Sequence, residues 1–158
     1  MSFTATSRRI GESLRQEIDV NGRHTIYTDE PESLGGDDTA PTPHELLPAI
    51  LASCVTTMVS LYAMNKGWHV GDLSAEVKYD NEAEPRQFDV TLNLPEGLTD
   101  DQVARLRKVA DTCPVRRALE AVDHLLVREV ARGARAAGRE RRGERNRHDE
   151  IQYRSQLV

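Results

Sequence analysis

The chain has 158 residues and a mass of 17.7 kDa, which suits one domain with a short appendage. Aromatic residues make up only 4% of it, so no large base-stacking or sugar-stacking surface is expected. Two cysteines, Cys54 and Cys113, are too few for a zinc ribbon or a disulfide scaffold, and no metal site is expected. No apolar stretch approaches the roughly 20 residues of a bilayer span, and the N-terminus lacks the apolar segment of a secretory signal. These features predict a cytoplasmic protein with reduced thiols and no membrane contact.

The net charge of −5 conceals two different parts of the chain. Residues 1–131 hold 13 Lys and Arg against 22 Asp and Glu, whereas residues 132–158 hold eight Arg against four Asp and Glu. We therefore predict a domain over 1–131 and an Arg-rich C-terminal extension over 132–158. Carboxylates dilute the arginines of the extension and no aromatic residues are interleaved with them, so nucleic acid is not the expected partner. Recruitment of the domain to an acidic partner is the alternative use of such a tail.

The first thirty residues predict β-structure. Segments near 4–10, 14–20 and 23–28 alternate in polarity, and Asn21-Gly22 favours a two-residue turn between the last two. Over 29–43 prolines and a pair of glycines interrupt the chain, which predicts a loop without regular structure.

A long apolar helix is predicted over 43–66. Residues 42–45, Thr-Pro-His-Glu, combine a capping box with proline at the first helical position, and Lys66-Gly67 supplies the C-terminal stop. Pro48 should kink this helix or restart it one turn later. Its middle is apolar almost all round, a pattern typical of a central helix or of one at a subunit interface.

The remaining elements come in strand pairs and helix pairs. They are predicted as strands over 73–80 and 87–94, helices over 99–110 and 112–121, and a last strand over 124–130. Because strands cluster instead of alternating singly with helices, the order predicts an α+β fold with a largely antiparallel sheet packed against helices.

Two cysteines and one glutamate are the candidate reactive residues. Cys54 lies on the long helix, where a buried thiol is usually inert unless a cation stabilises its thiolate. Cys113 precedes Pro114 at a helix start, with Arg116 and Arg117 within one turn, so local features favour its thiolate. The alternative for Cys113 is a cysteine that merely ends a loop.

Glu45 is explained structurally as the acceptor of the capping box. It precedes Cys54 by nine residues, about 13 Å along the axis of a straight helix. A break at Pro48 would change that separation. The sequence shows no dinucleotide fingerprint, phosphate-binding loop or serine-nucleophile motif.

Four blocks of sequence resemble the OsmC/Ohr family, the osmotically inducible and organic hydroperoxide resistance proteins. They are GGDDTAPTPHELL over 35–47, ASC over 52–54, YAMNKGW over 62–68 and, similar to the second cysteine motif of that family, CPVRRAL over 113–119. The similarity extends over roughly 5–130 in the order of elements and is closest to the OsmC-like branch.

The resemblance implies an intertwined homodimer of α+β subunits, with the cysteine-bearing helices at its centre and active sites at the interface. It also implies thiol-dependent reduction of organic hydroperoxides, with no bound cofactor. By this analogy Cys54 attacks the peroxide and becomes a sulfenic acid, and Cys113 then condenses with it to a disulfide. An external dithiol, in some family members a lipoyl group, would reduce the pair. The family thus assigns the first attack to Cys54, against the ranking from local features.

The sequence departs from the family pattern at two places. Strongly active members pair the attacking thiol with an arginine and a glutamate, and in the Ohr branch the glutamate directly follows the motif proline. This chain has His44 there and Glu45 one place later. No arginine occurs between Arg23 and Arg86, which leaves Arg23 and three earlier arginines as candidates: Arg8, Arg9 and Arg15.

A second hypothesis belongs to a different functional class. In it the cysteines are structural, and the dimer binds a small apolar ligand at its interface.

Overall fold

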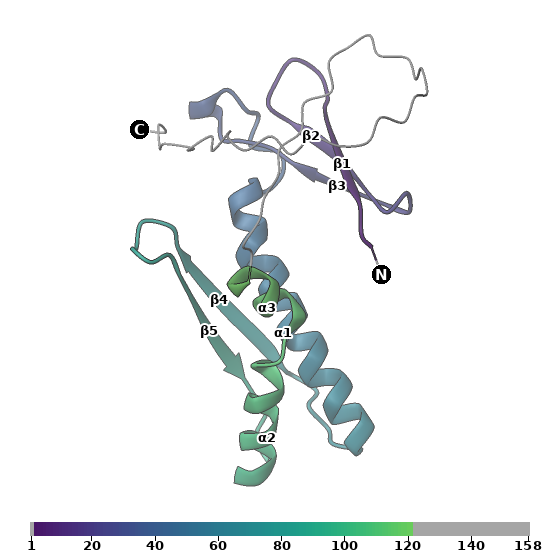
Figure 1. The fold of residues 1–158 in the computed structure, drawn as a ribbon, viewed down its shortest axis with the longest axis vertical. Helices are drawn as coiled ribbons and strands as arrows, with labels where there is room; N and C mark the ends of the chain where they lie inside the picture. Colours follow the sequence, from purple (N-terminus) through teal and green to yellow (C-terminus); the bar gives the residue numbers. More distant parts are fainter. Residues whose placement is uncertain (1, 122–158) are drawn as a thin grey trace, which may run out of the picture. The chain divides into compact units, whose positions relative to one another are not determined.

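The structure, a computed structural model, describes residues 2–121 of the chain (Figure 1). Its elements, in chain order, are β1 (Ala5–Arg9), β2 (Gln16–Val20), β3 (His24–Thr28), the 3₁₀ turn η1 (Glu32–Leu34), α1 (Pro43–Lys66), β4 (Ser74–Asp80), β5 (Gln87–Asn93), α2 (Asp100–Ala110) and α3 (Pro114–Glu120). The strand predicted over 124–130 and the boundary predicted at 131 lie outside the described residues.

The five strands form two antiparallel sheets, one of β1, β2 and β3 and one of β4 and β5. The predicted α+β class with antiparallel strands is therefore confirmed, although the described strands belong to two sheets. In the second sheet Tyr79 lies opposite Phe88, and their rings stack with centroids 4.4 Å apart. Val77 faces Val90 on the same side, so one face of this hairpin is apolar.

The turn between β2 and β3 is one residue longer than predicted. Asn21 and Gly22 have the positive φ angles of an Asn-Gly turn, 56° and 65°. However, Val20 pairs with His24, which leaves three residues in the connection. We attribute this to Asn21, whose backbone N–H donates to the Thr4 carbonyl at 2.9 Å while its side-chain oxygen accepts from the Thr4 N–H at 2.8 Å.

Helix α1 begins and ends where the sequence predicts. The Thr42 hydroxyl accepts from the Glu45 N–H, the Glu45 carboxylate accepts from the Thr42 N–H, and Gly67 closes the helix with φ 67°. The predicted restart at Pro48 is wrong, because a single helix runs through that residue. Pro48 removes only the hydrogen bond to the carbonyl of His44, and His44 lies exposed in the first turn, where water can replace that bond.

One stripe of α1 forms the core of this part of the molecule. Its buried members, four residues apart, are Leu51, Val55, Val59 and Ala63. The first two pack with Cys113 and the inner face of the β4–β5 hairpin, and the last two pack with Leu106 of α2. Figure 1 shows α1 flanked by this hairpin and by α2 and α3.

By length and composition α1 could also cross a membrane, contrary to the sequence prediction. The sequence prediction counted only uninterrupted apolar residues. Four small hydroxyl residues interrupt the apolar run of α1, but they do not make the helix polar overall: Ser53, Thr56, Thr57 and Ser60. The buried stripe and its packing against α2 and β4 account for the apolar residues on one face of α1, whereas Ile50, Leu61 and Met64 on another side of the helix are exposed.

The segment between β3 and α1 is organised by Asp29, which is buried. One carboxylate oxygen accepts from the Glu30 N–H at 2.9 Å; the other accepts from the Thr39 hydroxyl at 2.8 Å and from the N–H groups of Thr39 and Asp37. The backbone N–H of Asp29 donates to the Pro41 carbonyl, just before the helix cap. The predicted loop is thus an ordered lead-in to α1, and it also contains the short turn η1.

The same segment requires glycine at position 36. A Cβ there would lie 1.8 Å from the backbone oxygen of Glu30, which is far inside van der Waals contact. The Gly36 N–H donates to the Pro31 carbonyl at 3.2 Å, so the two backbone stretches are held together at this point. The glycine pair of the sequence therefore has a packing role.

We expect Asp29→Asn to destabilise the protein and to remove part of its sensitivity to acid. Burial alone would raise the pKa of Asp29, but the hydrogen bonds from Thr39, Glu30 and Asp37 outweigh it and lower this pKa. The contribution of Asp29 to stability is therefore present above the unfolded pKa of about 3.9 and is lost as pH falls through the folded value.

Urea unfolding at neutral pH and between pH 5 and 3 measures both effects. Asp37→Asn, which removes an exposed carboxylate, is the control. An Asp29→Asn protein with the midpoint and acid profile of the control would show that the carboxylate does not organise the segment.

Candidate active site

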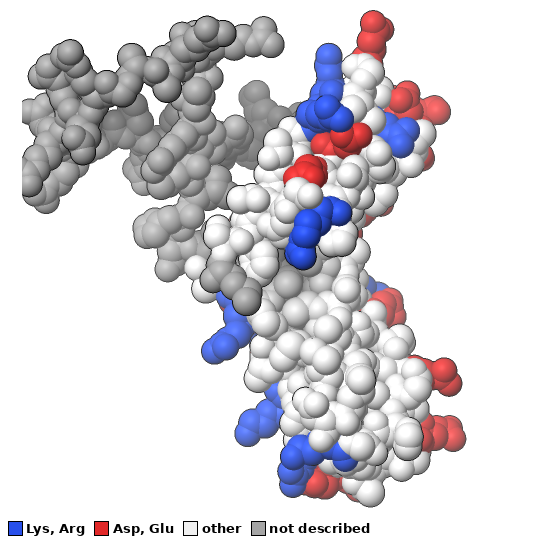
Figure 2. Space-filling view, turned by 90° about the vertical axis from the view of Figure 1, so that its right-hand side faces the viewer, with Lys and Arg blue, Asp and Glu red and all other residues white. Residues whose placement is uncertain are grey.

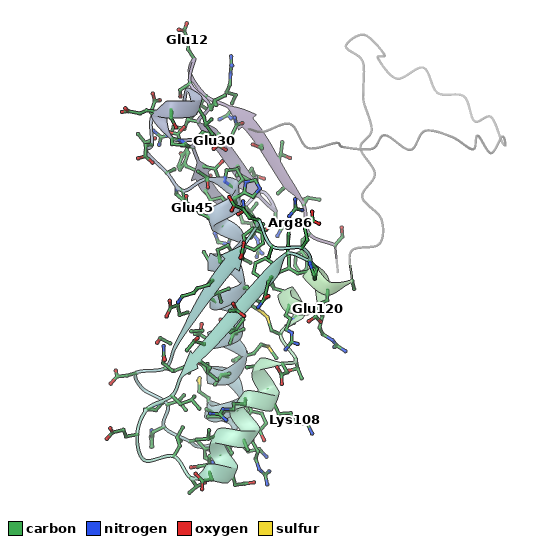
Figure 3. All side chains as sticks on the ribbon, turned by 90° about the vertical axis from the view of Figure 1, so that its left-hand side faces the viewer. Glu12, Glu30, Glu45, Arg86, Lys108 and Glu120 are labelled. Carbon is green, nitrogen blue, oxygen red and sulfur yellow. A yellow bond between two sulfur atoms is a disulfide. The ribbon has the colours of Figure 1, made fainter. Side chains whose placement is uncertain are left out.

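The two cysteines form a disulfide between α1 and the start of α3 (Figure 3). The Cα atoms of Cys54 and Cys113 lie 6.2 Å apart, within the 4.4–6.8 Å that such a bond requires. The cross-link joins residues 59 positions apart in the sequence. The pairing implied by the family resemblance is thus present in the fold.

Cys54 lies in the middle of α1, beside the buried stripe. Its neighbours Leu51 and Val55 are almost completely buried, whereas Cys54 itself is half-buried at the edge of the same cluster. Cys54 therefore lies at the boundary between core and surface.

Cys113 is the N-cap residue of α3, as the sequence predicts, and Pro114 is the first residue of that helix. The Cys113 side chain makes no capping hydrogen bond and is fully buried. Its N–H donates to the Ala110 carbonyl at 3.2 Å, and its carbonyl accepts from the Arg117 N–H at 3.1 Å. Cys113 is therefore the more deeply buried of the two cysteines.

Glu45 lies near the start of α1, where Figure 3 labels it. Its carboxylate accepts from the Thr42 N–H at 2.7 Å and completes the capping box. Because α1 is unbroken, nine residues place Glu45 about 13 Å from Cys54 along the axis. A single chain does not bring the predicted carboxylate to the sulfur.

The four candidate arginines differ in their surroundings. Arg8 pairs with Glu17, and Arg9 and Arg23 are exposed. Arg15 is half-buried, its guanidinium lies 5.1 Å from the centroid of the Tyr27 ring, and its Nε has no hydrogen-bond partner among the described residues. A buried donor without a partner is costly, so Arg15 is the arginine that most needs a further contact.

A cavity of about 1100 Å³ lies among α1, β5, α2 and α3. Its apolar walls include Leu51 and Val55, the neighbours of Cys54 on the helix, but neither sulfur borders it. Three arginines contribute cationic groups to its lining: Arg86, Arg107 and Arg116. Within residues 2–121, no three His, Cys, Asp or Glu side chains gather in a way that could hold a metal ion.

The family model for OsmC-like proteins matches residues 35–124. This chain belongs to the OsmC-like family. The match covers the lead-in segment from Gly35 onward, α1 with Cys54, the β4–β5 hairpin and the second cysteine motif, and it confirms the resemblance seen in the sequence.

Solved structures agree with the OsmC-like assignment. One is a Psychrobacter arcticus protein, provisionally named an osmotic stress induced and detoxification response protein. Its sequence is 26% identical and the TM-score is 0.62, over 75% of this chain and 88% of that protein. An OsmC-like protein of Mycoplasma pneumoniae (16% identity, TM-score 0.59, 77% and 87% covered) shares the fold. So does an organic hydroperoxide resistance protein, OsmC, of Legionella pneumophila (22% identity, TM-score 0.51, 77% and 90% covered). No curated protein matches the sequence.

Proposed function

We propose that this OsmC-like protein is a thiol-dependent peroxidase that reduces organic hydroperoxides in the cytoplasm by a two-cysteine mechanism. One observation carries the proposal: the two cysteines of the family motifs, 59 residues apart in sequence, lie within bonding distance and are joined. Such a disulfide is the product expected when one thiol is oxidised by a peroxide and the other resolves it.

The proposed reaction has three steps. The Cys54 thiolate attacks one peroxide oxygen, the O–O bond breaks, and the alcohol leaves with a proton while Cys54 becomes a sulfenic acid. Cys113 then attacks the Cys54 sulfur, an S–S bond replaces the S–O bond, and water leaves. An external dithiol, for which a lipoyl group is our candidate, exchanges with the disulfide and restores both thiols.

Burial supports the order of the two cysteines. Cys54 is half-buried, whereas Cys113 is completely buried, so a bulky organic peroxide reaches Cys54 more readily. A buried thiol needs no access to solvent in order to resolve a sulfenic acid beside it, because the Cα separation of 6.2 Å already permits the bond.

We assign to Arg15 the role of stabilising the Cys54 thiolate and orienting the peroxide. Its half-buried guanidinium and the unpartnered Nε leave it donors for an anionic sulfur or a peroxide oxygen. In a single chain Glu45 lies about 13 Å from Cys54 along α1. We therefore propose that Glu45 holds this guanidinium only when two subunits pack together, through the carboxylate oxygen that makes no hydrogen bond to the described residues.

We further propose that the protein acts as a homodimer. Only one stripe of α1 is buried, while Ile50, Leu61 and Met64 of the same helix are 48%, 51% and 71% exposed. Figure 2 shows a broad uncharged surface, and α1 itself carries no charged side chain between Glu45 and Lys66. A second subunit packed on this helix would bury the exposed apolar residues and bring further side chains to Cys54.

The cavity favours a second candidate function, the binding of a small apolar ligand beside structural cysteines. Its apolar walls suit such a ligand, three arginines also line it, and neither sulfur borders it. Replacement of Cys54 distinguishes the two functions, because only the peroxidase requires that thiol.

We expect Cys54→Ser to lower the consumption of cumene hydroperoxide to the uncatalysed rate. In Cys113→Ser the first turnover should persist, and a Cys54 sulfenic acid that a dimedone probe can trap should accumulate. Ser53→Ala, at an exposed neighbouring position of α1, should behave as the wild type. Undiminished peroxide consumption by Cys54→Ser would refute the peroxidase.

For Arg15→Lys we expect about a 10- to 100-fold loss of kcat/KM for cumene hydroperoxide, because an ammonium group cannot replace the fork of guanidinium donors. Alkylation of reduced Cys54 by iodoacetamide near neutral pH should slow as well. Arg9→Lys, on exposed β1, serves as the matched control. Equal rates in the two variants would exclude Arg15 from the site.

The wild-type chain should have twice its 17.7 kDa mass in light scattering at micromolar concentration. Leu61→Glu places a charge on the exposed apolar side of α1 and should shift the protein toward monomers. Leu34→Glu tests a leucine of similar exposure in η1 and should leave the dimer intact. A monomeric wild type would contradict the proposed assembly.

A further inference from the structure

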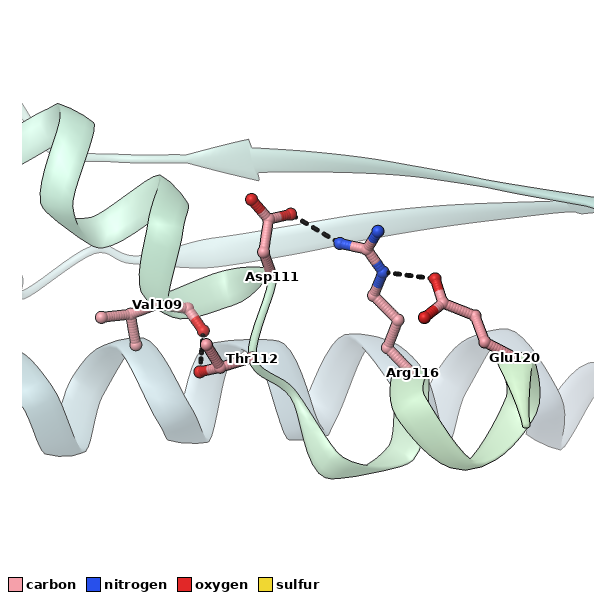
Figure 4. Close-up of polar contacts among 5 residues, drawn as sticks. All are labelled: Val109, Asp111, Thr112, Arg116 and Glu120. Atoms are coloured by element: carbon pink, nitrogen blue, oxygen red, sulfur yellow. Dashed lines mark hydrogen bonds and ion pairs between the residues drawn. The ribbon is translucent and has the colours of Figure 1, made fainter.

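The turn that carries Cys113 is spanned by one arginine with two carboxylate partners (Figure 4). Arg116 donates from Nη1 to Asp111 at 2.5 Å and from Nε to Glu120 at 2.9 Å. Asp111 is the C-cap of α2, two residues before Cys113, and Glu120 is the last residue of α3. Among residues 2–121, no other cation bonds two carboxylates.

Local hydrogen bonds fix the first half of this turn. The Thr112 hydroxyl and N–H both donate to the Val109 carbonyl, at 2.7 and 2.9 Å, and the Cys113 N–H donates to the Ala110 carbonyl. These bonds fasten the backbone up to Cys113 to the end of α2. These bonds do not determine the orientation of α3 after Cys113, which depends on other contacts.

Helix α3 has few other means of holding its position. It contains no buried residue, and of its side chains only Val115 packs against the cluster of Leu51, Val55 and Cys113. Only the bond to Asp111 links α3 to the end of α2, because Arg116 and Glu120 form an i,i+4 pair within α3.

We propose that Arg116 is a positioning residue for the resolving thiol. By bonding Asp111 at the end of α2, with Glu120 holding its guanidinium from within α3, it keeps the reduced Cys113 sulfur directed toward Cys54, ready to form the disulfide. Arg116 acts through the backbone of the turn, and the role is independent of any cation beside Cys54. The step it assists is the second one of the proposed function, in which Cys113 displaces water from the Cys54 sulfenic acid. The proposal rests on that function for the order of the steps.

The exposure of the ion pairs sets the size of the expected effect. The side chains of Arg116, Asp111 and Glu120 are 41%, 70% and 60% exposed. Exposed pairs are individually weak and are screened by salt. We therefore expect a change of about two- to fivefold in the closing of the disulfide, and no loss of folding.

Arg116→Gln in the full-length protein tests the proposal, with Arg117→Gln as the matched control. Arg117 is the adjacent residue of the same helix, is exposed, and makes no ion pair with the described residues. After one equivalent of cumene hydroperoxide, Cys54 should be oxidised at the same rate in both variants. Disulfide closure, followed by mass spectrometry after quenching with dimedone, should be about two- to fivefold slower in Arg116→Gln alone.

Two further measurements separate positioning from a general loss of structure. High salt should slow closure in the wild type toward the Arg116→Gln rate and should leave that variant unchanged. Arg116→Lys, which retains the charge but not the two-sided fork of donors, should give an intermediate rate. Equal rates of disulfide closure in Arg116→Gln, Arg117→Gln and the wild type would overturn the proposal.

Failure of the peroxidase itself would be recognised separately. If wild-type Cys54 does not react with cumene hydroperoxide, the proposed function falls, but equilibration with dithiothreitol still tests Arg116. The equilibrium constant for forming the Cys54–Cys113 disulfide should be about two- to fivefold lower in Arg116→Gln than in Arg117→Gln. Identical constants would refute the positioning role by this independent route.

Discussion

The contact between the middle of α1 and the turn before α3 holds together the two sequence motifs that carry the cysteines. Leu51, Val55 and Cys113 form one buried cluster, and the disulfide crosses it to Cys54. A covalent link that closes a 59-residue loop restricts the unfolded chain and stabilises the fold by about 4 kcal/mol in the loop-entropy account. Oxidation therefore stabilises the fold in which the two sulfurs lie near each other.

The helices could be predicted from the sequence because their ends are determined locally. The capping box at Thr42 and the glycine after Lys66 placed both ends of α1 to within a residue. The structure shows a second capping box at Thr99, which fixes the start of α2 one residue after the predicted bound. The errors arose where a distant residue decides the local geometry. Asn21 is drawn toward Thr4 across the sheet, which lengthens the predicted turn by one residue.

The candidate site was less predictable than the fold, because its geometry depends on contacts between segments. Local features favoured Cys113 as the reactive thiol, since a helix start and two arginines adjoin it. In the structure that sulfur is buried, and the side chain of Arg116 is engaged by Asp111 and Glu120. No sequence pattern distinguished Arg15 from its neighbours either, because its half-buried position over Tyr27 results from strand pairing.

The hairpin of β4 and β5, and α2 after it, lie entirely between the two bonded cysteines along the chain. In the oxidised molecule this stretch is a closed covalent ring. A single peptide-bond cut at the hairpin tip, residues 81–86, would open the ring without releasing either fragment. The same cut in the reduced molecule would leave two pieces joined only by packing, so the mass of a nicked chain in denaturant records the redox state it had.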